Sequence, residues 1–348
     1  MRRLFMQAAI LNEEKKLELR ELAKPKISAG GILIKVAASG ICNADLKMID
    51  KGHQALDYPR VLGHEITGII VESENDKFKK GDRVQVAPGI VCGECNFCQQ
   101  GITNHCQEID IFGFTVDGGF TEYIAISEKA LKANILNPIP ANLSFAEAVF
   151  AEPLACCING MEIANFSPNE SILIIGAGPI GCLQAMLAKS YGAKKIILVD
   201  KLKQRLEFAA SLGVDTLVKS EQESWQQFLT NYTAAQGIDL IFLASRQIKV
   251  DHSLIASLNK RGRLLLFSGF AEGKEKFEID ANLLHYGERA LIGAYGCTSE
   301  QNRKALQLIA EQKVVVKRLI TERISLKEIF AGIEKVRNKT ALKIIIEN

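Results

Sequence analysis

The sequence lacks several features that would place it in other classes of protein. No stretch approaches the ~18 consecutive apolar residues that a membrane-spanning helix requires, and no long basic run is present. The formal net charge is only +3 over 348 residues, which is too small to indicate nucleic-acid binding. The basic start at residues 1–3 is not followed by the apolar core of a signal peptide. We therefore expect a cytoplasmic protein with no membrane and no nucleic-acid partner.

Repeats, low-complexity segments and flexible linkers are also absent. Hydrophobic residues make up 47% and charged residues 24% of the chain, as in ordinary globular proteins. A chain of 348 residues is long enough for two domains with well-formed cores. The nine cysteines are an odd number and do not resemble the disulfide framework of a small secreted domain.

The expected elements change character at about residue 153. Before it, short runs rich in β-branched residues and bounded by Gly, Pro or Asp predict strands at Ile32–Ala38, Ile66–Glu72, Arg83–Ala87 and Phe120–Ile126. After it, strands and helices alternate, which predicts a doubly wound parallel sheet. The expected strands are Ser171–Gly176, Ile196–Asp200, Asp239–Ala244 and Arg263–Gly269, and the helices are Pro179–Tyr191, Leu202–Leu212 and Val250–Lys260. The tail adds an amphipathic stretch at Ser325–Arg337 and a strand at Leu342–Glu347.

A glycine motif joins the first of these later strands to its helix. It reads Gly176-Ala177-Gly178-Pro179-Ile180-Gly181. Such a turn lets the backbone approach a pyrophosphate, which then lies at a helix N-terminus. Asp200 ends the next strand, where an acidic residue binds a ribose hydroxyl and would repel a 2′-phosphate. The motif therefore favours NAD over NADP, and Arg205 is a further candidate for the cofactor site.

Four of the cysteines lie within fifteen residues, spaced C-x2-C-x2-C-x7-C. They are Cys92, Cys95, Cys98 and Cys106. A [4Fe–4S] centre would favour C-x2-C-x2-C-x3-C-P, but here the last gap is longer and Gln107 follows. We predict a structural zinc site, because four thiolates leave no open coordination position.

Candidate catalytic residues are more dispersed. They are Cys42, the pair His64-Glu65, and Glu152. A catalytic zinc needs about three protein ligands and one open position, and these residue types could supply them. The other histidines have no motif around them and are interpreted as structural or surface residues: His53, His105, His252 and His285.

With these motifs in this order, the sequence resembles the zinc-containing medium-chain alcohol dehydrogenases, and among them the polyol (sorbitol-type) enzymes, with threonine dehydrogenases nearby. The matching segments are Gly40-Ile41-Cys42 with Asp45, Tyr58-Pro59, Gly63-His64-Glu65, Gly81-Asp82-Arg83-Val84, the four-cysteine lobe, Asp117–Tyr123, Glu152-Pro153-Leu154 and the glycine loop. The resemblance implies a GroES-like catalytic domain at 1–152 with a zinc lobe at about 89–110. A Rossmann NAD-binding domain at 153–295 would follow, and residues 296–348 would return to the first domain.

The same resemblance implies roles for the dispersed residues. Cys42 and His64 would bind the catalytic zinc, the third ligand would be Glu65 or Glu152, and Asp45 would orient a ligand. Two zinc ions per chain are implied. Zinc would lower the pKa of a bound alcohol, which then transfers hydride to NAD. The implied substrate is a small secondary alcohol (a polyol, cyclitol or sugar derivative), and the implied assembly is a homodimer or homotetramer.

The sequence departs from the family's pattern in three places. Ala44 stands where relatives begin a proton relay with a hydroxyl, and Lys47 stands where many have a histidine. The proton could then leave through water, through a substrate hydroxyl, or through Lys47 if burial lowers the pKa of its ammonium. Arg246 replaces a small residue and is interpreted as part of an exposed loop. Rival functions are an L-threonine-type dehydrogenase, a reductase of a carbon–carbon or iminium double bond, and a binding protein without turnover.

Overall fold

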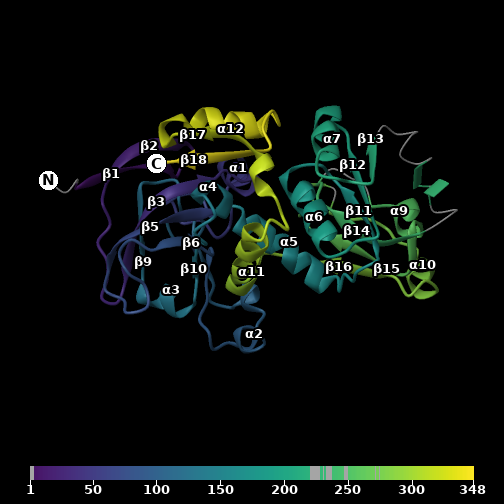
Figure 1. The fold of residues 1–348 in the computed structure, drawn as a ribbon, viewed down its shortest axis with the longest axis horizontal. Coiled ribbons are helices and arrows are strands. Elements are labelled where there is room, and N and C mark those ends of the chain that lie inside the picture. Colours follow the sequence, from purple (N-terminus) through teal and green to yellow (C-terminus); the bar gives the residue numbers. More distant parts are fainter. Residues whose placement is uncertain are drawn as a thin grey trace. The chain divides into compact units, whose positions relative to one another are not determined.

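The computed structural model describes residues 4–219, 228–229, 231–232, 237–246, 250–270, 272–273 and 275–348. The chain forms two compact units (Figure 1): residues 1–155 together with 297–348, and residues 156–296. The sequence placed the corresponding divisions after residues 152 and 295. Helix α5 (Ala151–Ile163) begins in the first unit and continues into the second. Within the described residues, no helix is long and apolar enough to span a membrane.

The first unit is built from β-sheets. Its strands are β1 (Phe5–Leu11), β2 (Leu17–Ala23), β3 (Ile32–Gly40), β4 (Arg60–Val61), β5 (Ile66–Ser73), β6 (Arg83–Val86), β7 (Gly89–Ile90), β8 (Asp110–Ile111), β9 (Tyr123–Ile126), β10 (Leu136–Pro138), β17 (Ile320–Ile324) and β18 (Lys343–Glu347). The largest sheet has the order β10-β6-β5-β3-β18-β17, with β9 also paired to β3. Strands β2, β1 and β4 form a separate sheet. A core of aliphatic side chains, including Ile34, Ile70 and Val84, packs against the large sheet.

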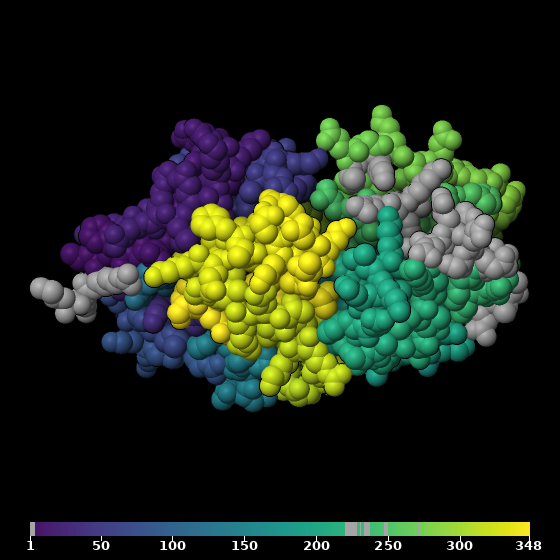
Figure 2. Space-filling view, turned by 90° about the horizontal axis from the view of Figure 1, so that it is seen from above, coloured from purple at the N-terminus to yellow at the C-terminus, as the bar shows by residue number. Residues whose placement is uncertain are grey.

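The chain's tail completes this first unit. Ile345, Ile346 and Glu347 of β18 pair antiparallel with the end of β3, on the edge of β3 opposite β5. In the space-filling view (Figure 2), the yellow C-terminal segment and the purple N-terminal segment accordingly share one surface. The helices of this unit are α1 (Asn43–Lys51), α2 (Asn96–Gln99), α3 (Glu128–Lys132), α4 (Phe145–Ala148), α11 (Ser299–Ala310) and α12 (Ile329–Arg337), with 3₁₀ turns η1 (Thr103–His105), η2 (Val316–Leu319) and η3 (Leu326–Glu328).

The second unit is a parallel sheet with helices between its strands. The sheet order is β13-β12-β11-β14-β15-β16, and every described pairing in it is parallel. This is the order of a dinucleotide-binding fold. Its strands are β11 (Ser171–Ile175), β12 (Lys195–Asp200), β13 (Thr216–Lys219), β14 (Ile238–Leu243), β15 (Leu258–Leu266) and β16 (Ala290–Gly293). Its helices include α6 (Pro179–Ser190), α7 (Lys203–Ala210), α9 (His252–Ala256) and α10 (Ala281–His285).

The bounds of several expected elements differ from the structure; the strand expected at Arg263–Gly269, for example, is β15 at Leu258–Leu266. The helix expected to reach Lys260 ends at Ala256, because buried Leu258 already pairs with Ile238 and begins β15. The strand expected from Phe120 begins at Tyr123, because the Phe120 backbone N–H donates to Leu62 O instead. In both places, a backbone contact with a residue outside the local segment overrides the local pattern.

Asp239 on β14 ties the second unit's sheet together. One carboxylate oxygen accepts from the backbone N–H of Ser171 at 2.7 Å and from its hydroxyl at 2.8 Å, and the other accepts from Asn259 Nδ2 at 2.6 Å. Partial burial acts to raise the pKa of Asp239, but these hydrogen bonds to the charged form lower it below 3.8. The ionised carboxylate therefore joins β11, β14 and the start of β15.

We expect Asp239→Asn to destabilise the protein by about 1 kcal/mol at neutral pH, because an amide has one acceptor oxygen, its NH2 group only donates, and all three donors cannot be satisfied. Since the pKa is lowered on folding, the stabilisation is present above pH 3.8 and is lost as pH falls through the folded-state value. Urea unfolding midpoints for both proteins should therefore converge in acid. A constant difference between pH 7 and the acid range would contradict this origin of the stability.

Candidate active site

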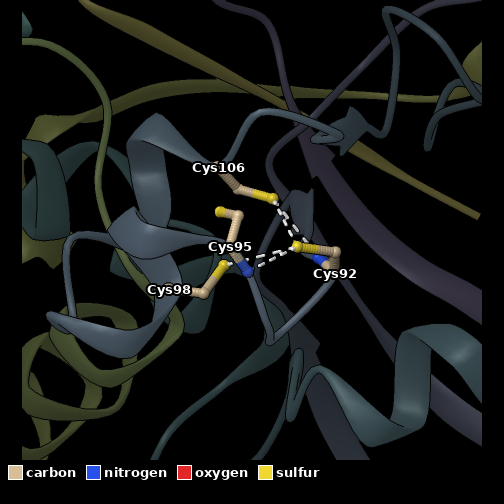
Figure 3. A group of neighbouring side chains, drawn as sticks. All are labelled: Cys92, Cys95, Cys98 and Cys106. Carbon is tan, nitrogen blue, oxygen red and sulfur yellow. Dashed lines mark hydrogen bonds between the residues drawn. The ribbon is translucent and has the colours of Figure 1, made fainter.

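The four clustered cysteines converge on one point (Figure 3). They come from the loop after β7 and from the short α2 and η1 turns, and all four sulfur atoms lie within 4.8 Å of one another. Cys92 Sγ is 3.9 Å from Cys98 Sγ and 3.5 Å from Cys106 Sγ. Zn–S bonds of about 2.3 Å in a tetrahedron would place the sulfurs about 3.8 Å apart. The cluster therefore fits one zinc ion.

Backbone donors also favour thiolates in this lobe. The N–H groups of Cys92 and Cys95 point at sulfur atoms, at 3.3 Å from Cys106 Sγ and 3.4 Å from Cys92 Sγ. The N–H of Gln107 is the main cause that lowers the pKa of Cys95 to about 6. Desolvation and neighbouring sulfurs raise the pKa of Cys98 to about 12. A bound zinc would deprotonate all four thiols.

A second group of possible ligands lies in the first unit. Cys42, His64 and Glu65 each offer a ligand atom within 4.8 Å of the others. Cys42 is the residue before α1, and His64-Glu65 immediately precedes β5. His64 is 6% exposed and Glu65 is fully buried. Thiol, imidazole and carboxylate are the donor types of a catalytic zinc site, so this group fits that metal.

Asp45 connects two members of this group. One of its carboxylate oxygens accepts from the Cys42 backbone N–H at 2.8 Å, and the other lies 3.5 Å from His64 Nδ1. Burial alone would lower the pKa of His64, but the Asp45 carboxylate raises it well above 6.5. Because Nδ1 faces Asp45, Nε2 is the nitrogen left for a metal. The structure thus brings Asp45 beside His64, where the family resemblance puts an orienting carboxylate.

Glu65 makes a buried ion pair that the sequence analysis did not find. Lys343 Nζ donates to Glu65 Oε1 at 2.5 Å and to Ile41 O at 3.3 Å. The lysine side chain is 4% exposed. Burial would lower the pKa of its ammonium, but Glu65 raises it above 10.5. The only signal in the sequence is a cation at the start of the apolar run 344–346, which local patterns cannot pair with a residue 278 positions away.

Two glycines leave room for this arrangement. A Cβ at Gly40 would collide with Glu65 Oε2 and come within 2.9 Å of Lys343 Cε. Gly63 has a φ of 93°, which L side chains rarely adopt, and a Cβ there would come within 2.6 Å of the Phe120 ring. Both glycines adjoin candidate ligands, so the absence of a side chain at these two positions is part of what lets the ligands lie where they do.

Glu152 and Lys47 are not part of this group, and Glu152 is grouped instead with Cys156 and Cys297. Glu152 is in the first turn of α5, is 8% exposed, and its charge contributes to raising the pKa of Lys343. Its carboxylate is not among the atoms grouped with Cys42 and His64. The Lys47 side chain is exposed, so the burial that a proton route through Lys47 requires is not there.

The second unit carries the glycine loop between β11 and α6. Gly178 is the residue before the helix, and Pro179 is its first residue. A Cβ at Gly178 would meet only Arg205 Nη1, at 3.6 Å, whereas a Cβ at Gly181 would collide with Gly176 O. Ile180 follows Pro179 in the first turn of α6. The loop is therefore open at Gly178 and closely packed at Gly181, as a phosphate-binding turn requires.

Asp200 and Arg205 flank this loop. The Asp200 carboxylate accepts from the backbone N–H groups of Ala177 at 2.7 Å and Leu202 at 2.8 Å. A carboxylate has about four lone-pair positions, so two remain for ribose hydroxyls. Arg205 Nε is buried and has no hydrogen-bond partner within the described part of the chain. The residues of this loop fit a dinucleotide. Arg246 is an exposed turn residue that donates to Gly269 O at 3.0 Å.

Comparisons with known proteins agree with this geometry. The sequence matches the models of the alcohol dehydrogenase GroES-like domain over residues 28–135 and of the zinc-binding dehydrogenase over 179–311. It is 30% identical over 338 residues to sorbitol dehydrogenase of Bacillus subtilis, covering 95% of this chain and 93% of that protein. It is 28% identical over 333 residues to D-arabitol-phosphate dehydrogenase of Enterococcus avium, covering 94% and 93%.

A solved structure resembles the whole chain. It is a zinc-binding dehydrogenase of Sinorhizobium meliloti bound to NADP, 26% identical, with a TM-score of 0.90 and coverage of 99% of this chain and 100% of that one. The fold, with its GroES-like and Rossmann parts, is thereby confirmed. The chain belongs to the zinc-binding alcohol dehydrogenase family.

Proposed function

We propose that this protein oxidises a secondary alcohol of a polyol or sugar derivative, with zinc and NAD as cofactors. The observation that carries the proposal is the grouping of Cys42 and His64 with the buried carboxylate of Glu65, in a chain that also has an open glycine loop. Sorbitol dehydrogenase and D-arabitol-phosphate dehydrogenase, to which the chain is similar along nearly its whole length, act on alcohols of this class.

When bound, zinc supplies Lewis-acid polarisation of an alcohol oxygen and NAD supplies the hydride acceptor. The chain's own residues hold and orient these groups. Asp45, whose carboxylate lies 3.5 Å from His64 Nδ1, would orient the imidazole with its proton on that nitrogen. Asp200, which lies at the loop where a ribose would bind, disfavours a 2′-phosphate. NAD is therefore the expected cofactor, in contrast to the NADP of the structure from Sinorhizobium meliloti.

We propose Glu152 as the third zinc ligand, because Glu65 is already held in an ion pair with Lys343. Lys343 is buried, and a buried charge that loses its partner costs about 3–5 kcal/mol. Glu65 cannot give up this ammonium without that cost. A thiolate and one carboxylate from Cys42 and Glu152 would balance the charge of Zn²⁺, while Glu65 and Lys343 balance each other.

The proton of the alcohol leaves through water or a neighbouring substrate hydroxyl. Ala44 has no hydroxyl to begin a relay, and Lys47 is exposed rather than buried. An open-chain polyol carries hydroxyl groups on both sides of the reacting carbon, so it can provide the first acceptor itself.

The test of the function is NAD⁺ reduction against sorbitol, inositols, polyol phosphates, L-threonine and simple secondary alcohols, with and without a zinc chelator. We expect chelator-sensitive turnover on a polyol or its phosphate. Turnover confined to L-threonine would replace the polyol proposal with the amino-alcohol one. A fully metal-loaded protein that binds NADH but oxidises none of these alcohols would contradict it.

The ligand assignment predicts different effects for the two glutamates. Purified protein should contain two zinc ions per chain, and Glu152→Gln should leave about one. Glu65→Gln should keep both ions but lower thermal stability, because Lys343 is then buried without a partner. The double substitution Glu65→Gln with Lys343→Met should recover part of that stability.

Elemental analysis and thermal unfolding of the four proteins measure these effects. Cys106→Ser is a matched control, because it removes a ligand of the four-cysteine lobe and should leave the other site loaded. If Glu65→Gln loses a zinc ion and Glu152→Gln retains both, the assignment is reversed.

We further propose that the protein is cytoplasmic and forms a homo-oligomer through β16. None of its cysteines forms a disulfide, and zinc-binding thiols need a reducing compartment. Strand β16 is an edge of the parallel sheet, and exposed Tyr286 and Tyr295 flank it. Unpaired edges are templates for pairing with a second copy. Light scattering should give a mass of at least two chains, and Ile292→Lys on β16 should reduce it to one.

A further inference from the structure

Three basic side chains gather beside the candidate metal site. Lys47 is exposed on α1, and His53 follows the end of that helix. Lys15 comes from the turn between β1 and β2, and its Nζ lies within 3.4 Å of the position that a Cβ on Gly52 would occupy. We refer to Lys15, Lys47 and His53 as the basic cluster.

No carboxylate balances this cluster. Within the described part of the chain, none of the three side chains forms an ion pair with an acidic residue. The two acidic residues of α1 have other neighbours: Asp45 is buried 3.5 Å from His64 Nδ1, and Asp50 is 2.6 Å from Arg337. The groups also act on one another, because burial and then the charge of Lys47 lower the pKa of His53. Mutually repelling cations without an anion are stabilised by an anionic ligand.

An aromatic side chain links this cluster to the candidate metal ligands. The His53 ring contacts the Phe114 ring edge-on, with centroids 5.4 Å apart. The other neighbour of Phe114 is His64, at 5.6 Å between centroids. His53 and His64 are thus separated by a single aromatic ring.

This separation suits the length of a polyol. An extended chain advances about 1.2 Å per bond, so an end group five or six bonds from the reacting carbon lies about 6–7 Å away from it. A hydroxyl carbon at His64 and Cys42 would then place the far end of the molecule at Phe114, whose ring centroid is 5.6 Å from that of His64 and 5.4 Å from that of His53.

The cluster offers hydrogen-bond donors and no strong acceptor. His53 Nδ1 accepts from the backbone N–H of Ala55 at 3.1 Å. The neutral imidazole therefore has its proton on Nε2, which is a donor. The ammonium groups of Lys15 and Lys47 can only donate. Donors of this kind suit the oxygens of a phosphate monoester or a carboxylate.

We propose that Lys15, Lys47 and His53 form a subsite for the anionic end group of the substrate, a phosphate monoester or a carboxylate on an open-chain polyol. The proposal rests on the proposed oxidation of a polyol. It gives Lys47 a part in binding instead of in proton transfer. Lys47, which stands where many relatives have a relay histidine, thereby helps to determine which alcohol is bound.

The test compares three substrates that differ only at one end: galactitol, galactitol 1-phosphate and galactonate. Steady-state kinetics with the holoenzyme should give a higher kcat/KM for an anionic substrate than for galactitol. Lys47→Gln and His53→Gln should each reduce that preference about tenfold, the value of one charge-assisted hydrogen bond. The change should appear in KM, because the contact is the same before and during reaction.

Matched variants separate the subsite from general effects of charge. Lys47→Arg should keep the preference. Lys80→Gln removes an exposed lysine before β6 and should leave all three substrates unaffected. Equal kcat/KM for galactitol and both anions, or an equal loss on all three in Lys47→Gln, would overturn the subsite while leaving the proposed oxidation intact.

A binding experiment decides the matter if none of the three is oxidised, an outcome that would count against the proposed function. Inorganic phosphate is titrated into the zinc-loaded protein, and the imidazole signal that disappears in His53→Gln is followed by ¹H–¹⁵N NMR. Saturable movement of that signal, weakened in Lys47→Gln, supports the subsite. An immobile signal, or equal movement in both proteins, refutes it. Phosphate and acetate titrations distinguish the two kinds of end group.

Discussion

The buried ion pair of Glu65 and Lys343 is the interaction on which the first unit depends. Taking both charges out of water is costly, and the pair is tolerable only with close contact and further hydrogen bonds. Lys343 has these from Glu65 and from the carbonyl of Ile41. The pair also joins the two ends of the sequence, because Glu65 precedes β5 whereas Lys343 begins β18. The ligands near Glu65 are therefore positioned only when the tail strand is in place.

Each unit carries a different part of what the proposed reaction needs: candidate metal ligands in the first and a candidate dinucleotide site in the second. The first holds the four-cysteine cluster and the group of Cys42, His64 and Glu65, which lie in loops and turns next to its strands. The second holds the glycine loop and Asp200, at the carboxyl ends of β11 and β12. Polar groups are concentrated at these points. Asp45 accepts from the Cys42 backbone N–H and also faces His64. The Asp200 carboxylate accepts from the Ala177 backbone N–H and so holds the glycine loop in place before a cofactor binds. Preorganisation of this kind reduces the ordering that binding requires.

Much of this was predictable from sequence because the signals are local. The cysteine spacing, the glycine motif with Asp200, and the alternating strands after residue 153 each lie within a few tens of residues. What could not be predicted depends on distant contacts. Lys343 is assigned to Glu65 only by the return of β18 to β3, and His53 is placed beside His64 only through Phe114. The end of α9 and the start of β9 were wrong for a similar reason, since backbone contacts with Ile238 and Leu62, outside the local segments, decide them.

The return of β18 to the first unit also sets an order of assembly. Residues 156–296 are contiguous and contain all the described strands of their own sheet, so its formation does not depend on the tail. The sheet of the first unit cannot be completed until residues 343–347 have been synthesised, because β3 lacks a neighbour along half of one edge without them. Closing so long a loop is slow, and an unpaired edge invites association with other chains. The metal-binding half of the molecule is thus the last to mature and the one most exposed to misassembly during synthesis.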